Sequence, residues 1–333
     1  MKKWLRVLGW GVAGVATLAA AGVGWLVVRK PAMAPPSNIR VSATPERIAR
    51  GKHLFLHVAD CAGCHTPRDF TRFSGPIAEA MIGAGFEFPA ELGLPGRIVA
   101  PNITPDNETG IGTWTDGEKI RAIREGISKD GRALFPMMPY QGFRNMSDED
   151  VFSLVAYMNS LPAVRTALPS TKVDFPVNLL IKSAPEPVAS VPPAPQPADK
   201  LAHGRYLATL AGCGGCHTRA EKGRAVEGME FAGGEAFRTK MGTAVSANIT
   251  PDKDTGIGKW SERDFVKKFH DYRDYAANGS PRVGPEGFTV MPWLGLSQLS
   301  EDELGSIYTF LRTQKPVYHS VETHPVLVSQ RAN

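Results

Sequence analysis

The amino-acid sequence predicts a mainly α-helical protein in which two tandem domains follow an N-terminal transmembrane helix. Three observations lead to this prediction. They are a long uncharged run near the N-terminus, an internal repeat over most of the remaining chain, and apolar residues at helical spacing inside each repeat. With 333 residues, of which 42% are hydrophobic and 21% charged, the chain is long enough for two folded domains and too apolar to be disordered throughout.

The first segment, residues 1–30, is typical of a membrane anchor. Residues 7–28 carry no charge and would form a helix of about 33 Å, which exceeds the roughly 30 Å of a hydrocarbon core. A cleaved signal peptide is the alternative, because Lys2 and Lys3 precede the run and three alanines offer a cleavage site. The run is longer than a usual signal core and ends at a basic pair, so we expect a single-pass anchor in a bacterial inner membrane. In either case the remaining chain would be exported, which places the folded domains in the periplasm.

The basic charge of the chain is confined to this segment. The formal net charge is +5, and residues 1–30 hold five basic side chains and no acidic one. The remaining residues hold 33 basic and 33 acidic side chains, so they are neutral as a whole. Because no excess of basic charge is left for a binding surface, the sequence argues against nucleic-acid binding.

The rest of the chain contains two similar units. A tether at residues 31–44 leads to the first unit at 45–182, and a proline-rich linker at 183–199 leads to the second unit at 200–320. Residues 321–333 remain as a C-terminal tail. Such a linker would allow either a fixed two-step wire or a tethered shuttle.

Four sequence pieces recur in both units in the same order, at spacings of 146 to 153 residues. The pairs are CAGCHT (61–66) with CGGCHT (213–218), PNITPDNETGIGTWT (101–115) with ANITPDKDTGIGKWS (247–261), MMPYQGF (137–143) with MPWLGL (291–296), and SDEDVFSLVAYM (147–158) with SEDELGSIYTFL (300–311). The nearly constant spacing indicates an internal duplication.

Each unit is predicted to contain the same helices. Short helices at 48–56 and 201–210 precede the cysteine motifs, and Thr115 and Ser261 begin capping-box sequences. Ser147 and Ser300 begin the last helix of each unit, whose apolar residues recur at i, i+3, i+4 and i+7. Loops as long as residues 66–113 suggest that something other than side-chain packing fills the middle of each unit.

The cysteines identify what fills the middle. All four lie in two Cys-x-x-Cys-His motifs, formed by Cys61, Cys64 and His65 and by Cys213, Cys216 and His217. This spacing is the attachment signature of haem c, because two sulfurs one helical turn apart can form thioethers to one porphyrin edge while the histidine binds the iron. A thioredoxin-like motif lacks its βαβ context, a zinc site would lack a fourth ligand, and disulfides across such short loops would add little stability. The sequence therefore predicts two covalently bound haem c groups.

The sixth ligand of each iron is expected from a distant loop. Met138 and Met291 stand at matching positions of the repeat, and each precedes a proline and an aromatic residue. The proline keeps the methionine backbone extended, which suits a side chain presented across a pocket. Met137 is the rival of Met138, and a second histidine from His53, His57 or His203 is the alternative ligand type.

Together these motifs resemble the class I cytochrome c domains of cytochrome subunits that serve membrane-bound periplasmic dehydrogenases for alcohol, sorbitol and gluconate. The resemblance covers residues 45–165 and 200–315, and it implies two tandem class I cytochrome c domains with His–Met haems. It also implies haem pockets lined by Asn102, Ile103, Thr104, Pro105, Pro139, Asn248, Ile249, Thr250, Pro251 and Pro292. Two features depart from the alcohol dehydrogenase subunits, which carry three haem motifs and a C-terminal membrane segment. This chain has two motifs, and its second unit has about seven extra residues between Trp260 and Met291.

The predicted function is single-electron transfer without catalytic residues, because an iron with two protein ligands has no open position for a substrate. We expect a membrane-anchored dihaem cytochrome that takes electrons from a periplasmic dehydrogenase, or from quinol or a quinol-oxidising complex. It would pass them to a terminal oxidase or another cytochrome. The alternative is a thiosulfate-oxidising or peroxidase-like dihaem enzyme, which needs an open distal position at one haem.

Overall fold

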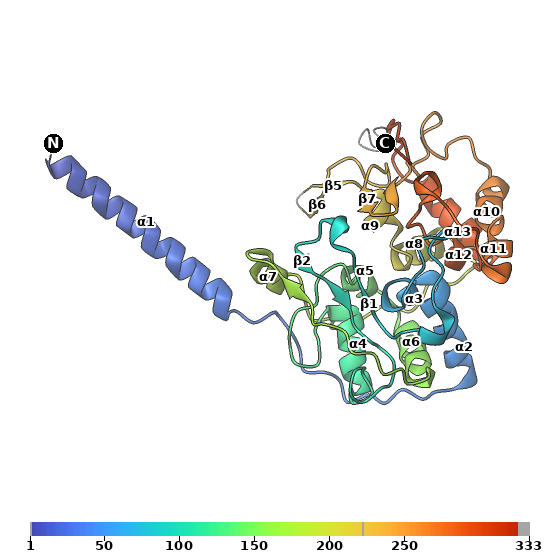
Figure 1. Cartoon of the computed structure of the whole chain (residues 1–333), viewed down its shortest axis with the longest axis horizontal. Coiled ribbons are helices and arrows are strands. Elements are labelled where there is room, and N and C mark those ends of the chain that lie inside the picture. Colours follow the sequence, from blue (N-terminus) through green and yellow to red (C-terminus); the bar gives the residue numbers. More distant parts are fainter. Residues whose placement is uncertain (1, 222, 326–333) are drawn as a thin grey trace.

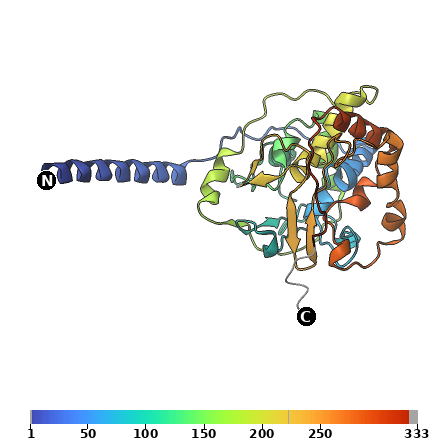
Figure 2. The ribbon, with the colours of Figure 1, turned by 90° about the horizontal axis from the view of Figure 1, so that it is seen from above.

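The structure is a computed structural model that describes residues 2–221 and 223–325, so residues 326–333 of the predicted tail lie outside the described residues. A long helix, α1 (Lys2–Val28), projects from a body formed by the rest of the chain (Figure 1). The same separation of α1 from the body is clear from above (Figure 2). The body is mainly helical, and the strands described in it pair into four small antiparallel sheets.

The predicted transmembrane helix is not supported. In the part of the chain that the structure describes, no helix is both long enough and apolar enough to cross a membrane. The helix α1 does form over the predicted segment, but five glycines and five alanines lie between residues 9 and 24. Such small side chains bring little apolar surface to the helix.

The first half of the body is built around α2 (Pro45–His53) and α6 (Asp148–Ser160), which cross each other. The helix α2 continues through a π-helical turn, η1 (Leu54–Val58), toward α3 (Cys61–His65). Between α3 and α6 lie η2 (Glu79–Met81), β1 (Phe86–Glu87), η3 (Ala90–Leu92), β2 (Gly96–Arg97), β3 (Val99–Ala100), α4 (Asp116–Glu125) and α5 (Tyr140–Phe143). After α6 come β4 (Lys172–Val173), α7 (Val177–Leu180) and η4 (Ile181–Ser183). β1 pairs with β3, and β2 with β4.

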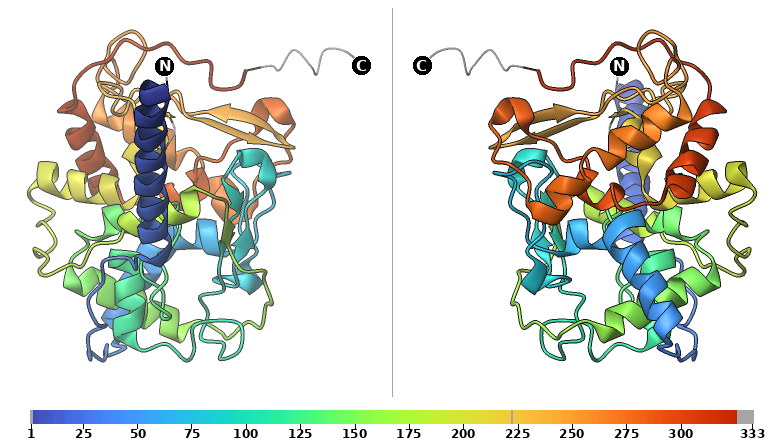
Figure 3. Two further views of the ribbon diagram at one scale, coloured as in Figure 1. Left: turned by 90° about the vertical axis from the view of Figure 1, so that its left-hand side faces the viewer. Right: turned by 90° about the vertical axis from the view of Figure 1, so that its right-hand side faces the viewer.

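The second half repeats this arrangement around α8 (Lys200–Leu210) and α13 (Glu301–Arg312). The intervening elements are α9 (Cys213–His217), β5 (Ala220–Glu221), β6 (Arg224–Ala225), β7 (Ala236–Thr239), β8 (Gly242–Val245), α10 (Glu262–His270), α11 (Arg273–Asn278), η5 (Pro285–Gly287) and α12 (Trp293–Leu296). β5 pairs with β6, and β7 with β8. Apart from the dark-blue α1, most segments coloured orange to red lie above those coloured blue to green in both views of Figure 3, so the two halves form neighbouring parts of the body.

The helix boundaries follow the predicted capping signals. Thr115 caps α4 and Ser261 caps α10, each in a complete capping box with the acid three residues on. Ser147 and Ser300 cap α6 and α13 in the same way through their hydroxyl groups. These local patterns are confirmed because the donors and acceptors that satisfy a helix end lie within a few residues of it.

Glycine sets the close crossing of the paired helices in each half. A side chain at Gly51 of α2 would overlap the backbone carbonyl of Ser153 in α6. Gly204 of α8 meets the carbonyl of Ser306 in α13 in the same way. Gly51 precedes Cys61 by ten positions, whereas Gly204 precedes Cys213 by nine. The π-helical turn η1 accommodates the additional residue of the first half.

The two halves pack against each other through reciprocal contacts. His53 Nε2 in the first half lies 2.8 Å from Glu303 Oε1 in the second, and Tyr206 in the second half donates to Asp150 Oδ2 in the first at 2.6 Å. Residues 53 and 206 occupy equivalent repeat positions, as do residues 150 and 303. Each half therefore offers the same pair of positions to the other, as in a two-fold symmetric interface.

A second set of contacts between the halves is reciprocal in the same way. Gly142 of the first half faces Thr209 of the second, and its repeat equivalent Gly295 faces Leu56 of the first. One cluster of buried apolar residues runs through both halves. The proline-rich segment therefore joins two units that touch, and the structure shows a fixed arrangement rather than a tethered shuttle.

The contact of Glu303 with the first half predicts that the stability of the protein decreases at acidic pH. Burial would raise the pKa of Glu303, but the hydrogen bonds from His53 and Ser300 lower it from 4.5 to about 2. Because the pKa of Glu303 is lower in the folded protein than in the unfolded chain, its ionised carboxylate stabilises the fold at pH values above about 4.5. This stabilisation is lost as the pH falls from about 4.5 toward 2. Glu303→Gln should remove on the order of 2–3 kcal/mol of acid-dependent stability, measured by denaturant unfolding between pH 6 and pH 2.

The matched control is Glu301→Gln, which changes an exposed carboxylate on the first turn of the same helix and should keep the wild-type pH profile. Equal acid profiles for wild type and Glu303→Gln would show that this contact does not carry the predicted sensitivity.

Candidate functional site

The two Cys-x-x-Cys-His motifs form two short helices, one in each half. Cys61 and Cys64 lie on α3, Cys213 and Cys216 lie on α9, and all four are free cysteines. Each helix follows a residue in the left-handed conformation, Asp60 at φ 46° and Gly212 at φ 67°. This conformation turns the chain sharply out of the preceding helix, and the i, i+3 spacing then places both sulfurs of a motif on one side of its helix.

The thiols of these motifs are held in the protonated form. Burial raises the pKa of Cys64 and of Cys213 to about 12. At Cys64 the Asp60 carboxylate and Cys216 of the other motif act in the same direction, so the two motifs lie close enough to interact. Within residues 2–221 and 223–325, no three or more His, Cys, Asp or Glu side chains are grouped to hold a metal ion.

The motif histidines have a defined tautomer. His65 and His217 are buried, and their Nδ1 atoms lie 2.8 Å from the Pro101 carbonyl and 2.7 Å from the Ala247 carbonyl. A carbonyl oxygen can only accept, so Nδ1 carries the proton and Nε2 keeps its lone pair. Burial also lowers the pKa of both histidines, which favours the neutral ring. Each half thus presents a neutral imidazole prepared to bind a metal through Nε2.

The asparagine of the predicted pocket motif fixes the loop that carries this carbonyl. Asn102 is 3% exposed, and its Oδ1 accepts from the Thr104 amide at 2.9 Å and from the Thr104 hydroxyl at 2.7 Å. Its amide donates to the Val164 carbonyl at 2.7 Å and to Thr109 at 3.0 Å. The asparagine therefore ties its own loop to the segment that follows α6.

Asn248 makes the equivalent set of bonds in the second half. Its Oδ1 accepts from the Thr250 amide and hydroxyl at 2.9 and 2.7 Å, and its amide donates to the Val317 carbonyl at 2.8 Å and to Thr255 at 3.0 Å. We call each of these two hydrogen-bond sets an asparagine clamp. The carbonyl that orients the histidine belongs to the residue directly before each asparagine, so the clamp holds that carbonyl in place.

The other residues of the pocket motif shape the same loop. Ile103 and Ile249 pack against the apolar core. A side chain at Gly112 would overlap the Pro105 carbonyl, and one at Gly258 would overlap the Pro251 carbonyl. The glycines that follow the motif are thus required by the close return of the chain. That all these residues line a haem pocket stays a prediction.

Two threonines directly after the motifs also take part, although the sequence analysis did not single them out. Thr66 accepts a hydrogen bond from the Gly83 amide, and Thr218 accepts one from the Phe231 amide, both at 3.1 Å. The signal was present, because both motifs continue as Cys-His-Thr. The carbonyls of Pro101 and Ala247 could not be found this way, because a backbone acceptor leaves no residue type to recognise.

The predicted methionines occupy matching turns. Met138 and Met291 are partly buried and pack against the core, and each precedes the proline that begins a short helix, α5 or α12. The amides of Tyr140 and Trp293 close the two turns onto the methionine carbonyls at 2.8 Å. Met137 is 37% exposed, which favours Met138 over its rival.

Two of the three alternative histidines have other hydrogen-bond partners. His53 contacts Glu303 between the halves, and His203 Nδ1 lies 3.4 Å from the Ser306 hydroxyl. The pKa of His57 is lowered to about 4, chiefly by burial, with the neighbouring His53 and Lys52 acting in the same direction. His65 and His217 differ from these three because they are buried and their Nδ1 atoms are held by a backbone carbonyl.

Buried donors without partners lie directly after Met138 and Pro139. Within the described residues, the Tyr140 hydroxyl and the Nε and Nη2 atoms of Arg144 are buried without a hydrogen-bond acceptor. Burial raises the pKa of Tyr140 to about 12, so its hydroxyl stays a donor at neutral pH. Unpaired buried donors are costly, and they match the carboxylate acceptors that haem propionates would bring. The donor set of this half thus fits haem.

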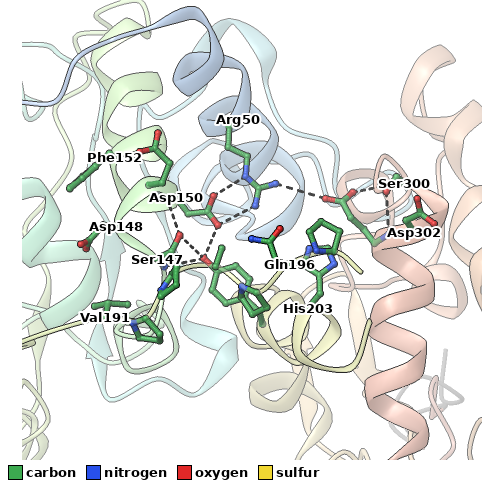
Figure 4. A pocket seen from close by; sticks show the side chains of 18 residues that line it. Arg50, Ser147, Asp148, Asp150, Phe152, Val191, Gln196, His203, Ser300 and Asp302 are labelled. Carbon is green, nitrogen blue, oxygen red and sulfur yellow. Dashed lines mark hydrogen bonds and ion pairs between the residues drawn. The ribbon is translucent and has the colours of Figure 1, made fainter. Parts of the chain in front are cut away.

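A separate cavity of about 960 Å³ lies between the first turns of α6 and α13, under the proline-rich segment 191–197 (Figure 4). Arg50 and Asp150 face each other in it with a two-pronged ion pair at 2.8 and 3.1 Å. His203, one of the alternative histidine ligands, lines this cavity, whereas the four cysteines, the two motif histidines and the two predicted methionines do not. Its polar lining belongs to the interface between the halves.

Comparison with known proteins connects these sites to a family. Residues 48–162 match the family described as Cytochrome c. The chain is 30% identical over 312 residues to a Diheme cytochrome c-type protein of Cereibacter sphaeroides, covering 90% of this chain and 96% of that protein.

Subunits of dehydrogenases are also similar. The Gluconate 2-dehydrogenase cytochrome c subunit of Pantoea cypripedii is 30% identical over 80% of this chain and 59% of the subunit. The cytochrome c subunit of Alcohol dehydrogenase (quinone) from Gluconobacter oxydans is 28% identical over 81% of this chain and 55% of the subunit. The chain thus spans little more than half the length of these dehydrogenase subunits.

The asparagine clamp predicts a large effect from a small substitution. Asn102→Ala removes four hydrogen bonds and leaves the buried Thr104 and the Val164 carbonyl without these partners. We expect a loss of about 3 kcal/mol in the free energy of unfolding, measured with denaturant on the purified protein. Asn107→Ala, which changes an exposed asparagine of the same loop, should be nearly neutral. Equal stabilities of the two variants would contradict the structural role given to the clamp.

Proposed function

The chain belongs to the cytochrome c family, and on this basis we propose that it is a dihaem electron-transfer protein that accepts single electrons from a periplasmic dehydrogenase. The observation that carries the proposal is the repeated constellation of two free thiols and one histidine with an available Nε2. Each half carries this constellation on its own short helix, α3 or α9, and each half has its own asparagine clamp. The repetition supports two haem domains, at residues 45–182 and 200–320, joined by the linker at 183–199.

We assign the following roles to the residues of each half. Cys61 and Cys64, and Cys213 and Cys216, would hold the haems covalently, and His65 and His217 would bind the irons through Nε2. Met138 and Met291 would complete the coordination. Haem c bound in this way supplies a one-electron iron couple whose potential depends on its axial ligands.

In this function the protein would hold the iron ligands in fixed positions. The clamps and the buried histidine bonds fix the donor atoms before and after an electron is gained. Cys61 and Cys213 pack against the apolar core, and the two halves are in contact through their reciprocal hydrogen bonds. A site that does not rearrange exchanges electrons with little reorganisation and offers no position for a substrate.

The partners are inferred from the relatives. Proteins similar to this chain are named as cytochrome subunits of alcohol, gluconate and fructose dehydrogenases. We therefore propose a dehydrogenase as the electron donor at the periplasmic face of the inner membrane, with quinol as the alternative donor. A terminal oxidase or another cytochrome would be the acceptor.

The ligand assignment predicts two separate changes in redox titrations. Met138→His and Met291→His should each lower the midpoint potential of one haem, because an imidazole stabilises ferric iron more than a thioether does. We expect shifts on the order of 0.2 V, within the ~0.8 V range that axial ligands span. Met137→His is the matched control and should leave both potentials unchanged. A shift in Met137→His without one in Met138→His would transfer the role to Met137.

The donor is tested by purifying the full-length protein from its native membranes and periplasm with its partners retained. A co-purifying dehydrogenase whose substrate reduces both haems would support the proposal. Reduction by a quinol alone, with no response to dehydrogenase substrates, would replace the dehydrogenase with quinol as the donor.

A further inference from the structure

We propose that Ser74, in the first half of the chain, positions Met291, the ligand assigned above to the second iron. This inference rests on the proposed function, since it needs Met291 as an iron ligand. It concerns a hydrogen bond that crosses from one half to the other. The first half would thereby complete the distal side of the second haem site.

The contact is direct and buried. Ser74 is 2% exposed, and its hydroxyl donates to the Met291 carbonyl at 2.7 Å. That carbonyl also accepts from the Trp293 amide at 2.8 Å, so it is held from two sides. The Met138 carbonyl accepts from the Tyr140 amide alone, as far as residues 2–221 and 223–325 are concerned. Among the described residues, the two methionine carbonyls therefore differ in this one bond.

The turn that carries Ser74 is held in a strained shape. Ser74 has a φ of 59°, a conformation that non-glycine residues adopt at a cost. Arg68 donates to the carbonyls of Ser74 and Gly75 at 2.6 and 2.7 Å, and its guanidinium lies over the Phe70 ring at 4.7 Å. This network fixes the direction of the Ser74 hydroxyl. Strain that is held by surrounding contacts is common at functional positions.

Arg68 also connects the turn to the first haem-attachment helix. Its Nη1 lies 3.4 Å from the carbonyl of Gly63, which stands between Cys61 and Cys64 on α3. One arginine side chain therefore contacts both the first Cys-x-x-Cys-His motif and the turn that reaches Met291.

The partner of this turn in the second half is the segment with the extra residues. Thr71 and Phe73 form backbone hydrogen bonds with Val283 and Pro281 at 3.0 and 2.9 Å, around an antiparallel bridge between Arg72 and Arg282. We call these paired segments, residues 71–74 and 280–283, the inter-half clasp. Its second segment, residues 280–283, lies in the stretch between Trp260 and Met291 that is about seven residues longer than in the first unit.

Aromatic stacking reinforces the inter-half clasp. Phe73 stacks on Tyr272 with ring centroids 4.9 Å apart and contacts Tyr275 edge-on at 5.8 Å. Phe70 contacts Phe288 at 6.0 Å. The additional residues of the second unit thus have a role, which is to receive the loop of the first half and bring Ser74 to Met291.

Fixing the Met291 carbonyl restricts the positions that its thioether can take. When its backbone turn is fixed, a methionine that dissociates from the iron would rebind quickly. When the turn is mobile, an added ligand would replace the methionine more readily. The inference therefore predicts that the Ser74 hydroxyl slows ligand exchange at the second haem and has no such effect at the first.

The test is the rate of cyanide binding to the oxidised full-length protein. Ser74→Ala keeps the β-carbon and the strained backbone and removes only the hydroxyl. Loss of one buried hydrogen bond should speed cyanide binding at the second haem by about tenfold. Met291→Ala identifies the kinetic phase that belongs to this haem, and the phase of the first haem in the same molecules reports that the variants are folded.

Ser280→Ala is the matched control. Ser280 is also a buried serine of the inter-half clasp, and its hydroxyl has no hydrogen-bond partner among the described residues. It should bind cyanide at the wild-type rate. Equal rates for Ser74→Ala and Ser280→Ala would overturn the inference while leaving Met291 as the ligand. Wild-type spectra and rates in Met291→Ala would instead overturn the ligand assignment of the proposed function.

Discussion

One hydrogen bond in each half sets the chemistry of this protein. The carbonyls of Pro101 and Ala247 force the motif histidines into the tautomer that leaves Nε2 free. Each carbonyl is positioned by the asparagine that follows it, whose clamp in turn depends on the segment after α6 in the first half and after α13 in the second. The long loop, the terminal helix and the cysteine motif are therefore linked through one backbone oxygen. A displaced clamp would release the histidine without changing any ligand residue.

The packing of the halves adds a second constraint. The duplication produced two surfaces that recognise each other, because His53 reaches Glu303 while Tyr206 reaches Asp150. This symmetric exchange brings the two cysteine motifs close enough for Cys216 to influence Cys64. The inter-half clasp is asymmetric, because the second unit alone carries the inserted residues that receive Phe73. A symmetric scaffold thus holds two sites that differ in how their methionine turns are supported.

The sequence predicted what depends on local or repeated residue types. The capping boxes at Thr115 and Ser261 were predicted from short patterns seen in both units, and the structure confirms them. The choice of Met138 over Met137 as an iron ligand stays a prediction, which the exposure of Met137 favours. The carbonyl partners of the histidines could not be predicted, because a backbone atom has no signature. Neither could the pairing of His53 with Glu303, since contacts 250 positions apart are fixed by how the halves dock. The transmembrane prediction relied on an uncharged run, and the structure does not support it.

We propose that both irons are bound by histidine and methionine, and the decisive experiment is the electron paramagnetic resonance spectrum of the fully oxidised protein. We expect two low-spin ferric signals of equal intensity, because each half would supply a strong histidine ligand and a methionine on the opposite face. A high-spin signal from half of the iron would contradict it. That result would mean an open distal position at one haem and would point to a dihaem enzyme.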